Sequence, residues 1–270
     1  MDIAIVTGAS SGIGREFVFE LHKWQKVDEV WVIARNKAKL EELKLITQLR
    51  LNIIILDWTK ELDINKYKKM LEEKKPNVKL LINCAGFGKF GVFNTISYED
   101  EVDMINLNLK ALVLLTRYTL PFMKEKAKII NVASRAAFQP LPYMAIYQAS
   151  KSFVLDYTKD INYELKYKGI RAIALCPNFV DTNFIPTAKK SDTKNIIKNY
   201  GEIVKADVVV KKCYHDLYKT KKNVSVYGFK NRFELFLMRF LPKDITLKIF
   251  DRMQGYPLKK KKKKKSTKKK

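Results

Sequence analysis

Short, almost continuously apolar runs alternate along the chain with longer segments in which apolar residues recur at helical spacing. The runs are rich in Ile, Val and Leu and alternate little with polar residues, which is typical of parallel strands covered on both faces. Segments of helical period include 14–26, 37–49, 99–124 and 147–168. We predict strands at residues 3–8, 30–35, 52–57, 79–86, 128–134, 170–177 and 223–228. This alternation predicts an α/β fold built on a single doubly wound parallel sheet of about seven strands.

The pattern changes after the last predicted strand, where the sequence reads FKNRFELFLMRFLPKDITLKIFDRMQGYP. One stripe of a helix there carries four phenylalanines, spaced i, i+4, i+7 and i+11: Phe229, Phe233, Phe236 and Phe240. Pro242 ends this helix, and we expect a second basic and apolar helix up to Gly255. Two interpretations stay open: the stripe packs on the sheet or on a partner subunit, or it lies in the interface of a lipid bilayer.

The length of 270 residues and the 47% share of hydrophobic residues suit one large α/β domain with a substantial core. No linker rich in Pro, Gly or Ser interrupts the chain. We therefore expect one domain over 1–256, with an amphipathic helical extension at 229–256, followed by a polybasic disordered tail over 257–270. The first residues run straight into a strand, which argues against a secretory signal, and no apolar run reaches the ~18–20 residues that cross a bilayer. We expect a cytoplasmic protein, peripheral at a membrane if the extension binds lipid.

The cysteines and histidines offer no sign of a metal site. Cys84, Cys176 and Cys213 lie far apart without CxxC spacing, which argues against structural zinc and against a disulfide framework. His22 and His215 lie in helical contexts, and we interpret both as structural or surface residues without acidic or cysteine partners.

The formal net charge is +25, and ten of these charges are lysines of the tail, so the rest of the chain carries +15. Such a surface attracts polyanions, among them anionic lipid, nucleic acid and phosphorylated ligands. The tail has no interleaved aromatic residues for base stacking, so nucleic acid ranks well below lipid. A solvated tail in a lysine-rich proteome would explain the charge equally well.

A glycine-rich turn, TGASSGIG, connects the first predicted strand to the first helix, with glycines at 8, 12 and 14. Its spacing differs from G-x-G-x-x-G and from the P-loop, but glycines still let the backbone approach a pyrophosphate at a helix N-terminus. An ordinary tight turn is the alternative, and the position and spacing favour nucleotide binding.

The end of the second predicted strand carries Arg35, and no acidic residue follows it before Glu41. An acid at this place would hydrogen-bond the ribose hydroxyls of NAD, whereas an arginine accommodates the extra phosphate of NADP. We therefore predict that NADP(H) is preferred over NAD(H), unless Arg35 is only a solvated loop residue.

The stretch AIYQASK places Tyr147 and Lys151 one helical turn apart. A free tyrosine has a pKa of about 10, and a nearby ammonium group favours the charged phenolate. The lysine is therefore expected to lower the pKa of Tyr147 toward neutrality. In a chain so rich in lysine the pair also arises by chance, so the spacing alone does not assign chemistry.

These motifs follow the order found in the short-chain dehydrogenase/reductase family, which the chain resembles over roughly residues 2 to 228. TGASSGIG is similar to its T-G-x-x-x-G-x-G turn, and NCAG to its N-N-A-G, with Cys84 replacing the second Asn. INLNLKA matches the helix bearing its catalytic Asn, with Ala111 where Gly is common. IINVAS ends thirteen residues before the Tyr of Y-x-x-x-K, and CPNFVDT resembles P-G-x-V-x-T, with Asn178 replacing the Gly.

The resemblance implies a Rossmann-like NAD(P)-dependent oxidoreductase acting on CH–OH donors, with four catalytic residues. It implies that Tyr147 supplies a proton, that Lys151 tunes it and holds the nicotinamide ribose, and that Ser134 contacts the substrate oxygen. Asn108 would hold a water that relays protons to Lys151, and the spacing favours it over Asn106. In isolation, Ser134 could equally end a strand and Asn108 could pack in a helix bend.

The resemblance also implies the cofactor contacts. Asp57 would touch the adenine, and Val180 and Thr182 would hold the nicotinamide amide. The full implied set is Thr7, Gly8, Ser10, Ser11, Gly12, Ile13, Gly14, Arg35, Asp57, Asn83, Ala85, Gly86, Tyr147, Lys151, Pro177, Val180 and Thr182.

We therefore predict reduction of a carbonyl to an alcohol, with a lipophilic ketone or acyl chain as substrate. The segment 183–201 stands where the family has its substrate-covering loop, and six side chains suit an apolar cleft: Phe138, Leu141, Tyr143, Phe179, Phe184 and Ile185. Helices 99–124 and 147–168 resemble the family's dimer-forming pair, so a homodimer is expected, or a tetramer. The rivals are a non-catalytic nucleotide-sensing or membrane-surface-binding protein on this fold, and a polyanion-binding protein.

Overall fold

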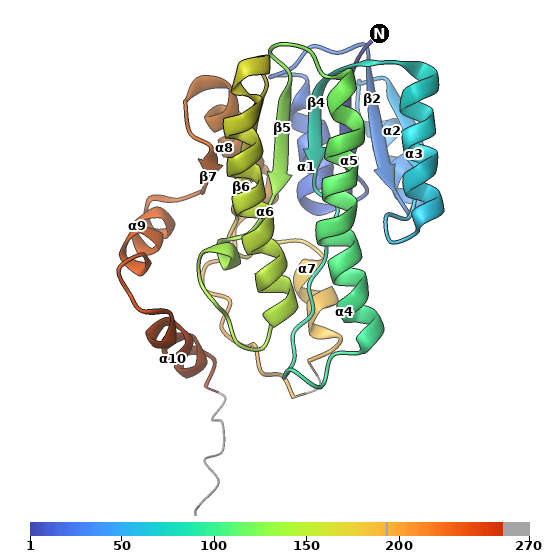
Figure 1. The fold of residues 1–270 in the computed structure, drawn as a ribbon. Helices are drawn as coiled ribbons and strands as arrows, with labels where there is room; N and C mark the ends of the chain where they lie inside the picture. Colours follow the sequence, from blue (N-terminus) through green and yellow to red (C-terminus); the bar gives the residue numbers. More distant parts are fainter. Residues whose placement is uncertain (193, 256–270) are drawn as a thin grey trace, which may run out of the picture.

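A seven-stranded parallel sheet forms the centre of the computed structural model, which describes residues 1–192 and 194–255 (Figure 1). The strand order is β3-β2-β1-β4-β5-β6-β7, and every neighbouring pair is parallel. The strands are β1 (Asp2–Thr7), β2 (Glu29–Ala34), β3 (Leu51–Ile55), β4 (Asn77–Asn83), β5 (Lys128–Val132), β6 (Arg171–Leu175) and β7 (Val224–Ser225). The predicted fold class and all seven strands are confirmed, and the predicted tail lies outside the described residues.

The order of the strands reverses between β1 and β4, which places a topological switch point at the carboxyl ends of these two strands. All six residues of β2 are buried, as are five of the six in β1, because helices cover both faces of the sheet. The seventh strand is shorter than predicted: only Val224 and Ser225 pair with β6, and the chain turns away at Gly228, whose φ is +84°.

Helices cover the sheet on two sides. α1 (Gly12–Leu21), α2 (Lys37–Ile46) and α8 (Ala206–Lys219) share one hydrophobic core with the sheet. α3 (Glu61–Lys74), α5 (Leu112–Thr119) and α6 (Ala145–Glu164) cover the other face (Figure 1). The remaining helices are α4 (Tyr98–Ile105), α7 (Phe184–Lys189), α9 (Phe229–Met238) and α10 (Lys243–Gln254).

The predicted helix over 99–124 is a composite. A π-helical turn, Asn106–Ala111, joins α4 to α5, and a 3₁₀ turn, Leu120–Phe122, ends the segment. A π turn carries one more residue than an α turn and is frequent at functional sites. Here it moves Asn108 into the interior, where the residue is 1% exposed.

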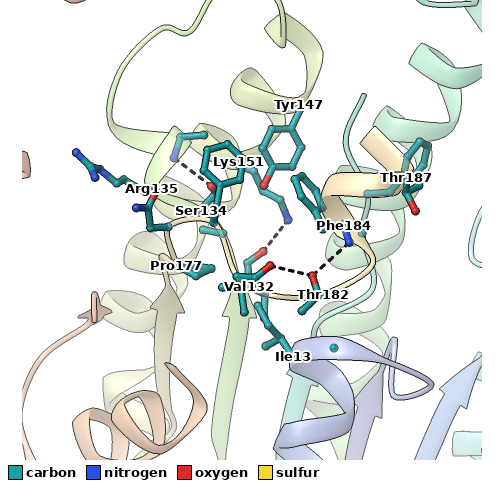
Figure 2. A pocket seen from close by; sticks show the side chains of 18 of the residues that line it. Ile13, Val132, Ser134, Arg135, Tyr147, Lys151, Pro177, Thr182, Phe184 and Thr187 are labelled. Atoms are coloured by element: carbon teal, nitrogen blue, oxygen red, sulfur yellow. Dashed lines mark hydrogen bonds between the residues drawn. The ribbon is translucent and has the colours of Figure 1, made fainter. Parts of the chain in front are cut away.

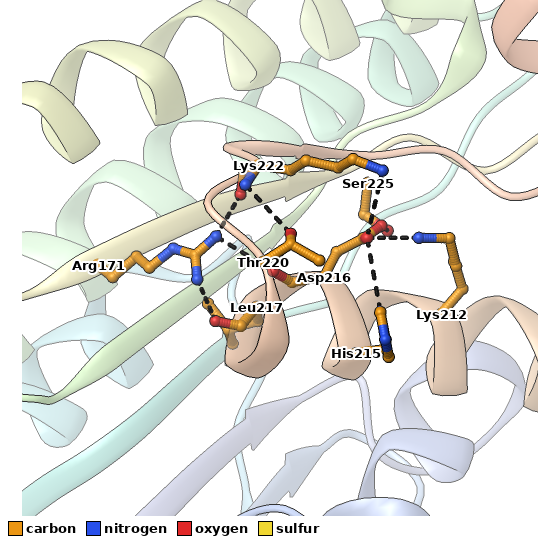
Figure 3. Close-up of polar contacts among 8 residues, drawn as sticks. All are labelled: Arg171, Lys212, His215, Asp216, Leu217, Thr220, Lys222 and Ser225. Atoms are coloured by element: carbon orange, nitrogen blue, oxygen red, sulfur yellow. Dashed lines mark hydrogen bonds and ion pairs between the residues drawn. The ribbon is translucent and has the colours of Figure 1, made fainter.

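A buried carboxylate ties α8 to the edge of the sheet (Figure 3). Asp216 accepts hydrogen bonds from the Ser225 hydroxyl at 2.9 Å and from the Lys212 ammonium group. His215 Nδ1 lies 3.9 Å from the same carboxylate, so the expectation that His215 lacks an acidic partner is wrong. Arg171 of β6 donates to the carbonyl oxygens of the same turn, including that of Asp216 at 3.1 Å. Breaking such a buried ion pair costs about 3–5 kcal/mol.

The C-terminal helices α9 and α10 lie beyond β7, beside the body of the protein (Figure 1). α9 buries Leu235 and Asn231, whereas the phenylalanine stripe is exposed: Phe229, Phe233, Phe236 and Phe240 are 52–75% exposed. The interpretation that this stripe packs on the sheet is therefore wrong. Within the described ranges, no helix is long and apolar enough to cross a membrane.

Candidate functional site

A cavity of about 760 Å³ runs along the carboxyl ends of the strands, from the turn after β1 to the C-terminal helices. One end is lined by Arg35 and Asp57, the middle by Ser134 and Tyr147, and the other end by Phe250 and other apolar side chains. Of the residues implied by the family resemblance, only Thr7, Asn83 and Asn108 do not line it. The cavity therefore brings the predicted cofactor and catalytic residues into one continuous space.

The glycine-rich turn fits closely against neighbouring backbone. Gly8 has φ of +67°, and a Cβ on it would lie 2.9 Å from the Ala85 nitrogen. A Cβ on Gly14 would lie 2.2 Å from the Gly8 oxygen, and one on Gly12 would meet Thr182 at 2.9 Å. Only glycine leaves this cradle open at the N-terminus of α1, which is the arrangement that admits a pyrophosphate. The turn therefore fits a dinucleotide.

Two of the predicted residues outside the cavity brace its walls. The Thr7 hydroxyl accepts hydrogen bonds from the backbone nitrogens of Cys84 at 3.0 Å and Ala85 at 3.1 Å. Asn83 Nδ2 donates to the Thr116 hydroxyl at 3.0 Å and to Asn131 Oδ1 at 2.8 Å. The Thr7 contacts thus fix the loop after β4 beside the glycine turn, and the Asn83 contacts tie the end of β4 to α5 and β5.

Arg35 and Asp57 face each other at the cavity end formed by β2 and β3, with Arg35 Nη1 3.8 Å from Asp57 Oδ2. Burial opposes ionisation of Asp57, but hydrogen bonds from Thr59 and the charge of Arg35 outweigh it, so the pKa of Asp57 lies below its ordinary value. A carboxylate and an exposed guanidinium group therefore share this end of the cavity.

Two basic residues near this end were missed by the sequence analysis. Arg15 and Lys39 line an adjoining hollow of about 570 Å³, and Lys39 also lines the main cavity. Arg15 Nη2 pairs with Glu42 at 2.9 Å, while its buried Nε has no partner among the described residues. Arg15 directly follows the last glycine of the turn, so its place on the first turn of α1 was a readable signal.

Ser134, Tyr147 and Lys151 point into the middle of the cavity (Figure 2). All three are at most 9% exposed. Lys151 Nζ donates to the Val132 oxygen at 2.8 Å and lies 5.8 Å from the centre of the Tyr147 ring. The Ser134 hydroxyl accepts from the Ala136 nitrogen at 3.1 Å. The end of β5 and one turn of α6 thus hold the predicted trio together.

The pKa values in this trio differ from the sequence expectation. Burial raises the pKa of Tyr147 to about 12, although the Ser134 hydroxyl acts in the opposite direction. Burial also lowers the pKa of Lys151 to about 8. The expected lowering of the Tyr147 pKa by Lys151 is therefore absent in this structure. The physical reason is that desolvation disfavours the charged form of both groups, and the Lys151 ammonium is directed at a backbone carbonyl.

Asn108 lies behind Lys151 rather than in the cavity. Its Oδ1 accepts from the Phe87 nitrogen at 3.1 Å, and its Nδ2 donates to the Phe87 oxygen at 2.9 Å and to the Ser150 hydroxyl at 3.1 Å. A Cβ on Gly86 would lie 2.9 Å from Asn108 Oδ1 and 3.4 Å from Lys151 Nζ. The side chain therefore pins the loop after β4 against α6.

The loop after β6 carries the predicted nicotinamide contacts. The Thr182 hydroxyl donates to the Val180 oxygen at 3.3 Å and accepts from the Phe184 nitrogen at 3.2 Å. Asn178, which replaces the family's glycine, has no positive φ, and its Nδ2 donates to the Glu202 oxygen at 3.3 Å. The turn thus forms without the backbone conformation that favours glycine.

The far end of the cavity is only partly as predicted. Leu141, Phe179 and Phe184 line it, but Phe138, Tyr143 and Ile185 do not. Phe138 packs in the core beneath α6, and the buried Tyr143 donates a hydrogen bond to Asp251 of α10. Residues of the C-terminal helices fill these places: Asn231, Glu234, Met238, Phe250, Met253 and Gln254.

Side-chain hydrogen bonds hold these C-terminal helices to the cavity wall. Arg135, next to Ser134, donates to Asn231 Oδ1 at 2.8 Å and pairs with Glu234. Gln254 Oε1 accepts from the nitrogens of Lys198 and Asn199, both at 2.9 Å. No local sequence pattern encodes these contacts, because they join residues 55–99 positions apart.

A family model described as short chain dehydrogenase matches residues 2–193. A very-long-chain 3-oxoacyl-CoA reductase of Anas platyrhynchos is 32% identical over 208 residues, which cover 73% of this chain and 65% of that protein. The 17-beta-hydroxysteroid dehydrogenase 13 of Homo sapiens is 27% identical over 262 residues, covering 94% and 83%.

Solved structures share the fold. The 3-ketoacyl-(acyl-carrier-protein) reductase from Brucella melitensis, complexed with NADH, matches with a TM-score of 0.70 and 26% identity, over 83% of this chain and 95% of that chain. A short-chain dehydrogenase from Sphingobium yanoikuyae in complex with NADPH matches with a TM-score of 0.74 and 24% identity, over 90% and 96%. The second likeness concerns the fold alone.

Proposed function

The chain belongs to the short-chain dehydrogenase family of oxidoreductases, and from that premise we propose that it is an NADP(H)-dependent reductase of a lipophilic carbonyl. The observation that carries the proposal is the convergence of Ser134, Tyr147 and Lys151 in one cavity, between a glycine cradle and an apolar compartment. The rival, a nucleotide-sensing or membrane-surface-binding protein without activity, needs no such trio.

In the proposed reaction, a dinucleotide held by the glycine turn would supply the hydride for the carbonyl carbon. Tyr147 gives its phenolic proton to the carbonyl oxygen, and the Ser134 hydroxyl donates a hydrogen bond to the same oxygen. With its pKa raised to about 12, Tyr147 holds its proton at neutral pH, as a general acid must. This favours reduction over the reverse oxidation, which would start from the phenolate.

Lys151 is the group best suited to restore the proton to Tyr147. Its pKa of about 8 lies close to neutrality, so its ammonium group gives up a proton at small cost. We propose that Asn108 acts through position: it fixes the backbone of Phe87 and so holds the loop after β4 beside Lys151. We also propose that Asn108 holds a water that relays protons to Lys151.

The NADP(H) preference rests on a cluster of basic side chains at the end of β2. Arg35 is free enough to turn toward a phosphate, since its side chain is 71% exposed and only loosely paired with Asp57. Lys39 lines the same end, and Arg15 lines the adjoining hollow. Basic side chains at this end of the cavity suit the additional phosphate of NADP.

The substrate class is inferred from the far end of the cavity. Aromatic and aliphatic side chains dominate there, among them Leu141, Phe184 and Phe250. The related proteins named above as a 3-oxoacyl-CoA reductase and a hydroxysteroid dehydrogenase act, by their names, on large apolar substrates. We therefore propose a long acyl chain or a bulky apolar ketone as the substrate.

The decisive experiment measures NADPH oxidation by the purified protein on a panel of long-chain 3-oxoacyl thioesters and bulky ketones. Tyr147→Phe is expected to lower kcat roughly a thousandfold, since the proton donor is lost. Tyr163→Phe is the matched control, because Tyr163 lies on the same helix and is 75% exposed. Turnover by Tyr147→Phe at the wild-type rate contradicts the acid role. NADPH binding without any turnover would favour the sensor.

The proposal extends to assembly and location. A homodimer would pair the composite helix α4–α5 with α6, where Ile105 and Phe153 are each 43% exposed. Light scattering tests this: Ile105→Glu with Phe153→Glu should halve the mass, and an unchanged mass would contradict this interface.

We treat residues 1–256 as one domain, because its C-terminal helices complete the cavity. The separated cysteines suit the cytoplasm.

A further inference from the structure

The outer sides of α9 and α10 carry two stripes of exposed apolar side chains. On α9, Phe229 stacks on Phe233, with ring centroids 6.3 Å apart, and Phe236 meets Phe240 of the following turn edge to face at 5.3 Å. On α10, the residues at i, i+4 and i+8 are Ile245, Ile249 and Met253. These seven side chains, which we call the apolar stripes, are 42–75% exposed. Exposed apolar surface this concentrated marks an interaction site.

The helices cannot turn these stripes inward without losing the cavity wall. On α9, Asn231 accepts a hydrogen bond from Arg135. On α10, Asp251 accepts from Tyr143, and Gln254 accepts from the backbone of Lys198 and Asn199. The rotation of each helix is therefore fixed by polar contacts on one side, which leaves the apolar stripes outward.

Positive charge surrounds the apolar stripes. The two helices and the turn between them carry six exposed basic residues: Lys230, Arg232, Arg239, Lys243, Lys248 and Arg252. They carry three acidic residues, of which Glu234 pairs with Arg135 and Asp251 accepts from Tyr143, so both are directed at the protein. After Asp251 the sequence contains no acidic residue, and ten lysines follow within 259–270. The outward charge of this surface is therefore strongly basic.

We infer that α9 and α10 dock on the surface of an anionic phospholipid bilayer. The apolar stripes enter the interface between headgroups and acyl chains, and the basic residues contact the phosphate and carboxylate headgroups. A second copy of the chain fits this surface poorly, because pairing two identical faces would bring their basic residues together. An anionic lipid surface complements both the apolar area and the charge.

Docking in this way places the mouth of the cavity at the lipid. Met253 belongs to both surfaces: it lines the cavity and is 54% exposed. A lipophilic substrate dissolved in the bilayer would therefore pass from the lipid into the cavity beside α10. This delivery of substrate rests on the proposed reductase function, whereas the docking surface stands without it.

Sedimentation with vesicles tests the docking independently of activity. The full chain is mixed with phosphatidylcholine vesicles or with vesicles that also contain phosphatidylserine, and the bound fraction is measured. The test variant combines Phe229→Ser, Phe233→Ser and Phe240→Ser. The matched control combines Leu45→Ser, Leu62→Ser and Phe93→Ser, which are 81–86% exposed elsewhere on the surface. NADPH binding checks that both variants are folded.

The wild type and the control variant should sediment with anionic vesicles and much less with neutral ones, and added salt should weaken the binding. The test variant should bind roughly tenfold more weakly. Equal sedimentation of wild type and test variant overturns the inference, since the lysine tail would then suffice. If the wild type does not sediment with anionic vesicles, the inference is also overturned. The same holds if the wild type is a dimer that does not bind vesicles and the test variant is a monomer, since the apolar stripes would then form the dimer interface.

Discussion

The two ends of the cavity are built by different means. At the cofactor end, the walls are strand ends and a glycine turn packed against buried backbone, as the approach of Gly8 to Ala85 shows. At the substrate end, the walls are short helices held by a few side-chain hydrogen bonds, such as those of Gln254. The end that we propose for the dinucleotide is therefore formed by the sheet and the turn after β1. The end that we propose for the substrate is closed by helices attached to the sheet.

The sharpest test of this difference compares two glycines with the same backbone conformation. Gly8, at the cofactor end, has φ of +67° and backbone atoms within 3.1 Å of its would-be Cβ, whereas Gly201, at the substrate end, has φ of +61° and nothing within 4 Å. Gly8→Ala should lower the free energy of unfolding by about 3 kcal/mol and abolish measurable NADPH binding. Gly201→Ala should cost only about 1 kcal/mol.

Chemical denaturation and NADPH titration measure both quantities. If both variants lose the same free energy of unfolding, the positive φ alone determines the destabilisation. The two ends of the cavity would then not differ in packing.

Lys151 stands between the two ends, and its burial predicts a pH-dependent stability. Its pKa is about 8 in the folded protein and about 10.5 in the unfolded chain. Between these values only the unfolded chain holds the proton, so the stability rises with pH by about 3 kcal/mol. Below pH 8 both states are charged, and the cost of the buried charge is fully present. Lys151→Met should remove this rise and stabilise the protein at pH 7 while abolishing turnover.

Urea denaturation at several pH values between 7 and 11 measures the effect. The control is Lys159→Met, which lies two turns further along α6 and has a side chain that is 40% exposed. A stability profile for Lys151→Met that matches the wild type would contradict the burial argument.

Arg35→Ala tests the charge of the cofactor end without touching its backbone. The loss of one phosphate contact should raise the KM for NADPH roughly tenfold and leave the KM for NADH nearly unchanged. Arg50→Ala is the matched control, because Arg50 is similarly exposed and pairs with Glu29 at the opposite end of the strands. Steady-state kinetics with NADPH and with NADH measure the two KM values. An equal rise in both KM values would refute a phosphate contact by Arg35.

Gln254→Leu should give the smallest effect, because it loosens only the substrate end. The backbone nitrogens of Lys198 and Asn199 lose their acceptor, and the wall around Tyr200 becomes less ordered. The KM for substrate should rise a few fold, with an unchanged affinity for NADPH. Isothermal titration measures the NADPH affinity, and steady-state kinetics measure the KM for substrate. A weaker NADPH affinity in the variant would contradict this prediction and would show that the two ends of the cavity are coupled.

Most residues that line the end of the cavity at the glycine turn could be named from the sequence, because local rules govern their geometry. Glycines at fixed spacing, a strand followed by Ser134, and the Tyr147 and Lys151 pair on one helix face each describe a geometry within a few residues. The seven strands were found for the same reason, since buried parallel strands are continuous apolar runs. Lys39 has no such signal, because a basic residue on a helix is ordinarily a solvated one.

The pKa of Tyr147 and the orientation of the helices at the substrate end were harder to predict from the sequence. Burial of Ser134, Tyr147 and Lys151 depends on how α6 packs on β5, so the raised pKa of Tyr147 has no local signal. An aromatic stripe on a helix ordinarily marks the buried face. α9 instead buries Asn231 and Leu235, because hydrogen bonds from residues about a hundred positions away, such as Arg135, fix its rotation. Contacts over such separations are not encoded in a local pattern.

The brevity of β7 has a consequence for how the protein behaves at high concentration. A long exposed edge strand offers unpaired backbone groups on which another chain can align and begin an aggregate. Here the edge strand has two residues, Lys221 and Lys222 precede it, and the chain leaves the sheet at Gly228. The edge is too short and too charged to template a neighbour. The truncated strand therefore protects an otherwise continuous parallel sheet against fibrillar growth from this side.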